Sequence, residues 1–274
     1  MTCTFLCALC STQISAQSTE KRADSLFAAK NYEAASLEYE RAYFISKNSQ
    51  ALYKKGLSQK QELKFKQALA SLQRVQPWIE TDSVIYQVYY ERSICAYLAE
   101  DYTEAKNQIQ IMKYLIHDSL IHDQILFLEI LNLNELRQWD EASILFSKYI
   151  QKNNVQAEVE DYYGFMDHPH LKNENTASIL STFIPGSGQI YAGDAGDGFI
   201  SLGFQIIALG YAGLSFYQGY FINGFVSGFG LFQRFYFGGI INAAEAAQKH
   251  NYLKAREYND KIKFLIVQTE QSGK

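Results

Sequence analysis

Charge is almost absent from one long stretch of this chain. Between Thr176 and Gln248 the only charged residues are Asp194, Asp197, Arg234 and Glu245. The same stretch contains 14 of the 17 glycines. So little charge excludes a water-facing globular surface, because such surfaces carry many ionised side chains. The stretch therefore predicts a glycine-rich segment that contacts a membrane.

Cysteine is nearly absent beyond the first ten residues. Cys3, Cys7 and Cys10 lie at the start, and Cys95 is the only other cysteine. Residues 1–17 are an apolar run followed by small residues, which is typical of a signal peptide, although the usual positively charged beginning is missing. After cleavage Cys95 would stand alone, which excludes an intramolecular disulfide and a cysteine-based metal site. We interpret Cys95 as a buried, inert thiol.

The chain also lacks the features of a nucleic-acid partner and of an enzyme. Its formal net charge is −4, and its basic residues are interleaved with acidic ones, so no basic stripe indicates nucleic acid. No Ser-His-acid set, paired carboxylate cleft or cofactor fingerprint is present. We therefore expect a protein without catalytic activity and without a cofactor.

Two kinds of short motif resemble ligand-binding sequences but are incomplete, and the glycine-rich ones are better explained as turns. Gly186–Gly188 and Gly193–Gly198 are glycine-rich, yet they lack the lysine and the preceding strand of a phosphate-binding loop. His168-Pro169-His170 offers two imidazoles, with Asp167 beside them, but no complete set of metal ligands. We expect no metal site at this position.

An aromatic residue followed three positions later by alanine recurs four times in the first half of the chain. The alanines are 33, 37 and 37 residues apart. Each pair opens an amphipathic run in which the small alanine allows close helix approach and a larger residue fills the space one turn later. The pairs are Tyr32/Ala35, Phe65/Ala68, Tyr102/Ala105 and Trp139/Ala142, followed by Tyr39, Leu72, Ile109 and Phe146.

These repeated residues resemble the tetratricopeptide repeat, whose period is about 34 residues. The resemblance covers residues 18–151 and is degenerate, because only Gly56 supplies the glycine of a first helix and only Pro77 ends a unit. It implies an all-α fold, a helical solenoid of about four repeats, with a concave face that receives a peptide or a partner protein. The alternative is a helical bundle without a binding role.

Side chains on the first helix of each repeat are the candidates for partner contact. Their ring faces and amides suit an extended peptide backbone. The competing interpretation is that most of them are packing residues. The candidates are Tyr53, Tyr86, Tyr90, Tyr97, Phe127 and Asn134, with Tyr89 and Asn132 beside them.

Beyond the repeats we expect a polar linker over residues 152–175, a glycine-rich membrane hairpin over 176–258 and a polar tail over 259–274. Phe199–Tyr217 and Tyr220–Ile241 are the two apolar stretches, and a tight turn separates them. Each stretch approaches the ~20 residues that cross a bilayer. Small residues should allow the two helices to pack closely, namely Gly203, Gly210 and Gly213 against Gly224, Gly228 and Gly230.

Arg234 interrupts the second apolar stretch. A charge at membrane depth is costly and usually has a partner. Glu245, Asp194 or a lipid phosphate could serve, or the side chain could extend to the interface.

The motif that begins Pro-Gly-Ser-Gly-Gln and ends at Gly198 is similar to small two-helix membrane domains with a Gly-x-x-Gly signature. It also resembles hairpins that follow tetratricopeptide repeats in uncharacterised bacterial envelope proteins. The His-Arg-Phe-Tyr portion of many two-helix domains is absent, so the resemblance implies a shared fold more than a shared role. The matching residues are Pro185, Gly186, Gly188, Gln189, Tyr191, Gly193, Gly198 and Asn242, and together with Arg234 they form the expected membrane-hairpin set.

Three functions follow as hypotheses. The first is a membrane-anchored scaffold of the bacterial envelope, with periplasmic repeats that bind a protein or peptide partner and a hairpin that contacts lipid. The second is a hairpin that assembles or inserts membrane proteins, and a homo-oligomer through the hairpin is left open. The third and weakest is an enzyme at the membrane surface that uses Asp194, Asp197 or Arg234.

Topology conflicts with a simple even hairpin. A cleaved leader places the repeats outside the cytoplasm, and the hairpin then returns the basic tail to the same side, contrary to the positive-inside bias. Either the broken segment Ile179–Tyr191 counts as a span, or the tail is an interfacial helix.

Overall fold

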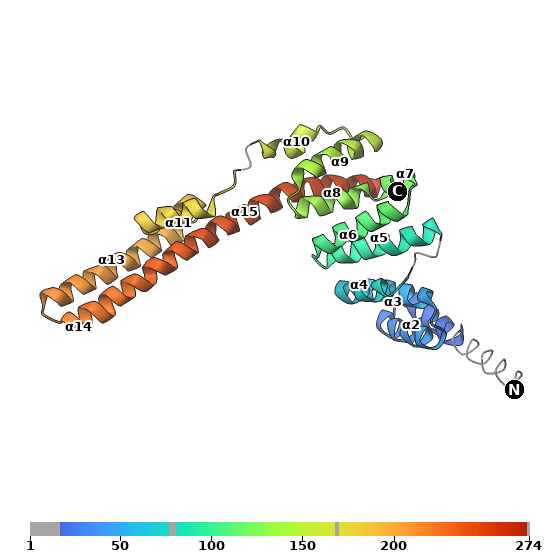
Figure 1. The fold of residues 1–274 in the computed structure, drawn as a ribbon, viewed down its shortest axis with the longest axis horizontal. Coiled ribbons are helices and arrows are strands. Elements are labelled where there is room, and N and C mark those ends of the chain that lie inside the picture. Colours follow the sequence, from blue (N-terminus) through green and yellow to red (C-terminus); the bar gives the residue numbers. More distant parts are fainter. Residues whose placement is uncertain (1–16, 77–80, 168–169, 273–274) are drawn as a thin grey trace, which may run out of the picture. The chain divides into compact units, whose positions relative to one another are not determined.

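A computed structural model of the protein describes residues 17–76, 81–167 and 170–272, except for the side chains of residues 119–121. All regular secondary structure in these ranges is helical, which confirms the expectation of an all-α fold. The chain divides into two compact units, Met1–Ala157 and Glu158–Lys274 (Figure 1). Most of the expected signal peptide and Pro77 lie outside the described residues.

The first unit is a stack of helices in which each packs mainly on its neighbours in sequence. It comprises a helix over residues 17–28, followed by α2 (Tyr32–Ser46), α3 (Ser49–Gln61), α4 (Phe65–Gln73), α5 (Asp82–Leu98), α6 (Tyr102–Leu115), α7 (Ser119–Gln124), α8 (Leu126–Glu135) and α9 (Trp139–Lys152).

One turn geometry recurs four times between helices of this stack, and a fifth time after α9, at Asn154. In each turn a residue adopts the left-handed backbone conformation, and the next N–H reaches back to a carbonyl five residues earlier, as from Asn31 to Leu26 at 2.9 Å. This bond satisfies one of the carbonyls left open at a helix end. The four residues, spaced like the alanines, are Lys30 (φ 60°), Leu63 (φ 60°), Glu100 (φ 62°) and Arg137 (φ 56°).

The recurring alanines lie in the core of the stack. Ala35, Ala68, Ala105 and Ala142 are all fully buried, and so are the larger residues one turn later. At Gly56, an added Cβ would lie 2.6 Å from Leu72 Cγ, so this position of α3 requires glycine for the same close approach. The described helices therefore confirm a helical stack with a repeated core pattern.

The second unit is built around two long helical segments. Its elements are α10 (Val159–Tyr163), the 3-10 turn η1 (Gly164–Met166), α11 (Glu174–Phe183), α12 (Ser187–Ala192), α13 (Ala195–Tyr217), α14 (Phe221–Asn223), the π-helical segment η2 (Gly224–Phe229) and α15 (Gly230–Ser272).

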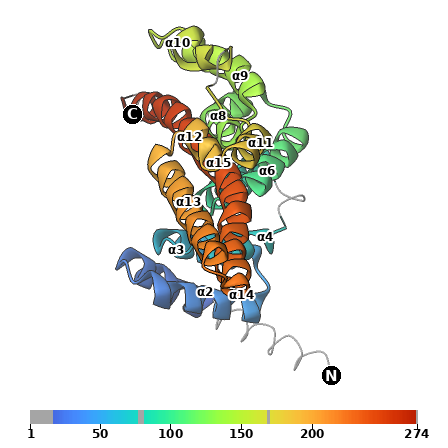
Figure 2. The same cartoon turned by 90° about the vertical axis from the view of Figure 1, so that its left-hand side faces the viewer.

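The helices α13 and α15 lie side by side in both views and form a helical hairpin with α14 and η2 (Figures 1 and 2). The chain reverses at Gly219, whose φ of 83° favours glycine, as the expected turn requires. The helices α11 and α12 pack on α15 at the other end of the hairpin. The segment before α11 is tied to α15 by two hydrogen bonds between Asn251 and the backbone of Lys172, at 2.7 and 2.8 Å. Helix α15 continues without a break through residue 259, where we placed the start of a polar tail.

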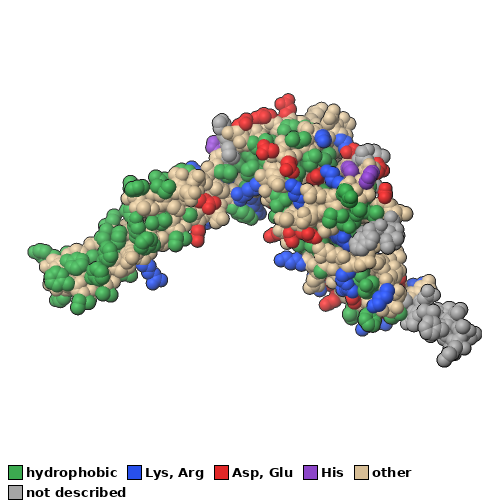
Figure 3. Space-filling model, viewed as in Figure 1, with side chains coloured by type: hydrophobic (Ala, Val, Ile, Leu, Met, Phe, Trp, Pro, Cys, Tyr) green, Lys and Arg blue, Asp and Glu red, His purple; other side chains and the backbone are tan. Residues whose placement is uncertain are grey.

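One helix in the described part of the chain, α13, is long and apolar enough to cross a membrane. Its 23 residues span about 35 Å at 1.5 Å per residue. The second apolar stretch, Tyr220–Ile241, is helical too, but it is divided among α14, η2 and α15. Hydrophobic side chains gather over the end of the unit that holds α13 and α14 (Figure 3).

Candidate functional site

The glycines of the Pro185–Gly198 motif allow backbone to meet backbone at the base of the hairpin. Gly186 follows Pro185 at the bend between α11 and α12 and has a φ of 85°. A Cβ on Gly186 would lie 2.1 Å from the carbonyl oxygen of Gly198, and a Cβ on Gly198 would lie 2.6 Å from that of Gly186. A side chain at either position would push the start of α13 away from α12.

Gln189 lies at the centre of a buried polar network. Its Oε1 accepts a hydrogen bond from Ser181 Oγ at 3.1 Å, and its Nε2 donates to the carbonyl of Gly239 at 3.0 Å. The Gly188 N–H donates to the same Ser181 oxygen at 3.0 Å. A Cβ on Gly188 would lie only 2.0 Å from the Ala177 carbonyl oxygen. The network therefore joins α11, α12 and α15 at one point.

Three further motif residues hold the ends of these helices. Gly193 ends α12 with a φ of 96°. Asp194 then caps α13 by accepting a hydrogen bond from the Asp197 N–H at 3.3 Å. The Tyr191 hydroxyl accepts from the Asn173 N–H at 3.2 Å. These contacts give the motif a structural role, which is consistent with turns at the two glycine-rich runs.

A cavity of about 610 Å³ opens between α13 and α15, next to this network. It brings together Gln189, Arg234 and Asn242 of the expected membrane-hairpin set. Sequence reasoning missed Ser201 and Lys249, although the spacing of polar residues along α15 is a signal for one helix face. The polar and charged lining residues are Gln189, Asp194, Asp197, Ser201, Arg234, Asn242, Glu245 and Lys249.

Arg234 makes no ion pair with any carboxylate of the described ranges. Of the alternatives considered for Arg234, pairing with Glu245 or Asp194 is therefore not observed. Glu245 lies eleven residues further along the same helix, or about 16 Å. Apolar surface flanks the arginine instead, including the stacked rings of Phe204 and Phe235, whose centroids are 5.2 Å apart.

The close packing of the hairpin uses fewer glycines than we expected. A Cβ on Gly228 would lie 2.5 Å from Ala212 Cβ, and one on Gly224 would lie 3.2 Å from the Ala212 carbonyl oxygen. The other four glycines named for this contact face open space, with nothing within 4 Å of an added Cβ. These are Gly203, Gly210, Gly213 and Gly230. The partner of the two packed glycines is thus an alanine.

The expected partner-binding residues of the helical stack fall into two groups. Tyr53, Tyr86, Tyr90 and Phe127 are half-buried, and the rings of Tyr86 and Tyr90 stack at 5.4 Å. Tyr53 lines a hollow between α3 and α5 with Asn48, Gln50, Val84 and Gln87. Burial and then the nearby Glu91 carboxylate raise the pKa of Tyr53 to about 12, so its hydroxyl stays protonated.

Tyr97 and Asn134 are buried, with exposed fractions of 8% and 1%. Tyr97 donates a hydrogen bond to Glu135 Oε1 at 3.4 Å and its ring contacts Tyr102. Both residues are therefore packing residues and are not accessible to a partner. The same holds for Tyr89 and Asn132, whose exposed fractions are 5% and 1%.

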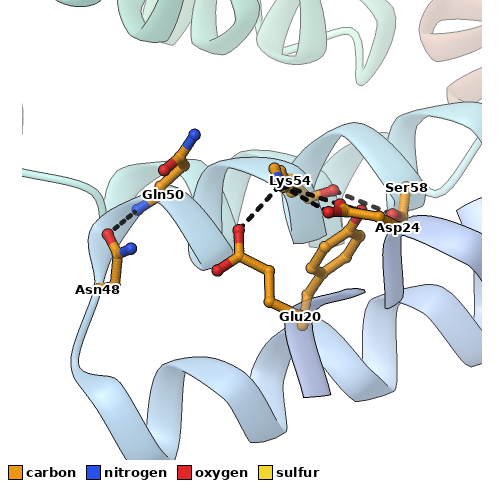
Figure 4. A network of polar contacts seen from close by, with 7 residues as sticks. Glu20, Asp24, Asn48, Gln50, Lys54 and Ser58 are labelled. Carbon is orange, nitrogen blue, oxygen red and sulfur yellow. Dashed lines mark hydrogen bonds and ion pairs between the residues drawn. The ribbon is translucent and has the colours of Figure 1, made fainter. Parts of the chain in front are cut away.

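Two charged clusters hold the stack together. Buried Arg92 donates hydrogen bonds to the carbonyls of Leu72 and Val75 at the end of α4, and burial lowers its pKa. Lys54 of α3 binds Glu20 Oε1 at 2.8 Å and Asp24 Oδ1 at 2.9 Å on the first helix (Figure 4). These contacts secure the helix over residues 17–28 against α3.

The histidine motif and Cys95 are the remaining candidates for ligand binding. The described residues contain no group of three or more His, Cys, Asp and Glu side chains that could hold a metal ion. His168 and Pro169 of the histidine motif lie outside them. Cys95 is fully buried, which confirms the buried thiol, and burial raises its pKa to about 12.

No family model, curated protein or solved structure matches this chain.

Proposed function

We propose that this protein is a non-catalytic scaffold anchored in a membrane of the bacterial envelope. Its helical stack, which resembles tetratricopeptide repeats, would bind a protein or peptide partner, and its hairpin would lie in the bilayer. The observation that carries the proposal is the exposure of α13. Only 22% of the most apolar 18-residue stretch of this helix is buried.

The core of a soluble domain would show the opposite pattern. A long apolar helix in such a core is mostly buried, whereas the large side chains of this hairpin point outward. Along α13 the exposed side chains include Ile206 (61% exposed) and Ile207 (68% exposed). The opposite segment exposes Phe221, Ile222, Phe225 and Val226 in the same way. A bilayer is the surrounding that would cover these faces.

The polar groups of the hairpin fit this surrounding. Both long segments satisfy their backbone internally as helices, which lipid requires. Ser181 and Gln189 are buried and bonded to each other, as polar side chains between membrane helices often are. Tyr217 and Tyr220 flank the turn at one end, and charged residues resume at Glu245 at the other, which suits two membrane interfaces.

Support for partner binding comes from the half-buried aromatic residues of the stack. Tyr53, Tyr86 and Tyr90 combine exposed ring area with hydroxyl groups, a combination that suits a peptide backbone. The amides of Gln50 and Gln87 line the same hollow as Tyr53 and could bond to peptide groups.

Cell fractionation tests the anchoring. We expect the full chain, tagged after Lys274, to stay with membranes in alkaline carbonate, and the repeats to be digested when intact spheroplasts are treated with protease. A carbonate-soluble chain would overturn the membrane anchor. Protected repeats in a carbonate-resistant chain would overturn only their periplasmic placement.

Site-specific photocrosslinking tests the partner surface. A benzophenone amino acid in place of Tyr86 should capture one distinct partner, while the same group in place of Tyr114, which is 80% exposed on α6, serves as the matched control. Equal capture from both positions would argue against a specific surface at Tyr86.

A second role, in the assembly of membrane proteins, is favoured by the outward-facing Gly203 and Gly210 on α13. Small residues on a lipid-facing helix allow another helix to approach. Leucine at both positions should then abolish the biological function while partner capture at Tyr86 persists, whereas the scaffold proposal expects both to persist.

A further inference from the structure

The cavity between α13 and α15 has an ordered arrangement of charge along the hairpin. Two contacts with α15 define the alignment. From α12, Gln189 Nε2 donates a hydrogen bond to the Gly239 carbonyl, and from α13, Phe204 stacks on Phe235. Because the two helices run in opposite directions, Arg234 lies on the side of the cavity toward the turn at Gly219. Asp194, Asp197, Glu245 and Lys249 lie at the other end.

The two ends of the cavity differ in their surroundings. Arg234 stands among Ile200, Phe204 and Phe235, whose apolar side chains line the same cavity. At the other end the apolar band gives way to the charged half of α15. In a bilayer, Arg234 would therefore lie nearer the hydrocarbon, and the three carboxylates would lie nearer to water.

This order of charges matches one class of lipid headgroup. In a zwitterionic phospholipid the phosphate lies next to the acyl chains, and the ammonium group extends further toward water. A guanidinium binds phosphate through paired hydrogen bonds, and a primary ammonium can donate up to three hydrogen bonds to carboxylates. The deeper cation thus faces the phosphate, and the outer end, where three carboxylates outnumber the single basic residue Lys249, faces the ammonium.

We propose that this cavity binds the headgroup of phosphatidylethanolamine. Arg234, aided by the Ser201 hydroxyl and the Asn242 amide, holds the phosphate, while Asp197 and Glu245 accept hydrogen bonds from the ammonium. The acyl chains then cover Phe204 and Phe235. The inference rests on the proposed membrane anchoring and adds a specific ligand to it.

The cavity is less suited to the other common headgroups. An anionic lipid such as phosphatidylglycerol offers a phosphate to Arg234 but brings no cation to the carboxylates, which outnumber the basic residues of the cavity three to two. Phosphatidylcholine carries a charge that cannot donate hydrogen bonds to them. Free phosphate lacks the groups that would contact either the carboxylates or the apolar wall.

Native mass spectrometry of the full chain, released from detergent with equimolar phosphatidylethanolamine, phosphatidylcholine and phosphatidylglycerol, tests this proposal. We expect preferential retention of phosphatidylethanolamine. Arg234→Gln should weaken binding of all three lipids about 10-fold, the effect of losing about 1.4 kcal/mol. Asp197→Asn and Glu245→Gln should instead reduce the preference for phosphatidylethanolamine. A separate titration with inorganic phosphate identifies a simple anion site.

The matched controls are Arg256→Gln and Asp260→Asn, which alter an exposed ion pair on α15 outside the cavity, with 3.6 Å between Nε and Oδ2. They should leave lipid binding unchanged. Equal retention of the three lipids by the wild type, unchanged binding in Arg234→Gln, or tight binding of inorganic phosphate alone would each overturn the lipid site. The measurement takes place in detergent, so this failure is separate from a failure of membrane anchoring, which carbonate extraction reports.

Discussion

At the residue scale, the hairpin depends on where side chains are missing. Gly228 lies against Ala212 so closely that an added Cβ would fall 2.5 Å from the alanine Cβ and 2.6 Å from its Cα. Gly210 belongs to the same hairpin but faces open space. A side chain is therefore excluded at Gly228 but has room at Gly210, although the two glycines look alike in the sequence.

Alanine substitutions at these two glycines should have effects of opposite sign. Gly228→Ala forces α13 and η2 apart and should destabilise the hairpin by about 1–3 kcal/mol. Gly210→Ala meets no neighbour and should stabilise its helix by about 0.5–1 kcal/mol. Thermal unfolding of the purified full chain in detergent, followed by circular dichroism, measures both. Equal shifts for the two variants would contradict the packing described for Gly228.

At the scale of single elements, the first helix of the stack is held by charge. Asp24 accepts hydrogen bonds from Tyr39 at 2.7 Å and from Lys54. Burial acts to raise the pKa of Asp24, but these hydrogen bonds and the Lys54 charge together lower it. Hydrogen bonds from Arg74 lower the pKa of Glu40 in the same way, with Lys55 adding to the effect against burial.

These two carboxylates predict a loss of stability in acid. A carboxylate with a lowered folded-state pKa stabilises the fold above its unfolded value, 3.8 for Asp24 and 4.5 for Glu40, and this contribution disappears as the pH falls through the folded value. Because the Asp24 side chain is 46% exposed, we expect its share to be below about 1 kcal/mol.

Urea unfolding of the full chain in detergent at pH 7 and pH 3 measures this share. Asp24→Asn should be less stable than the wild type at pH 7, and the difference should become smaller at pH 3, below the unfolded value of 3.8. Asp167→Asn, at an exposed position after η1, is the control and should follow the wild type at both values. A difference between Asp24→Asn and the wild type that does not change with pH would contradict this electrostatic role.

Most helices could be predicted from the sequence because their determinants are local. The alanine spacing located the beginnings of four helices, and their buried alanines confirm that pattern. The turn residues Lys30, Leu63, Glu100 and Arg137 could not be predicted, because none is a glycine and only the packed helices fix their φ values. The cavity could not be predicted either. It depends on the alignment of α13 against α15, and tertiary contacts fix this alignment, not the sequence of either segment alone.

At the scale of the whole molecule, the chain consists of two compact units that meet in sequence at Ala157 and Glu158. The residues from Asn153 to Glu158 between α9 and α10 are turn or irregular structure. Each unit has its own pattern of burial, with large side chains inside the stack and on the outside of the hairpin. The two units should therefore respond differently to water and lipid.

Limited proteolysis of the full chain in vesicles should separate the two units. We expect trypsin to cut after Lys152 and a glutamate-specific protease to cut after Glu158, since these bonds lie at the boundary rather than inside a packed helix. The N-terminal fragment should be released into solution, and the C-terminal fragment should sediment with the vesicles. Early cleavage inside α5 or α6, or release of both fragments, would contradict this division.

The continuity of α15 has a mechanical consequence. From Gly239 to Ser272 the helix contains no further glycine and no proline, so nothing in its sequence supplies a hinge. Suppose that the apolar half of α15 rotates about its own axis relative to α13, for example by the 100° that separates consecutive helical residues. The charged half would then rotate with it. A rotation of the hairpin end of α15 would thus also turn the C-terminal end of the same helix, some 50 Å away along the helix axis.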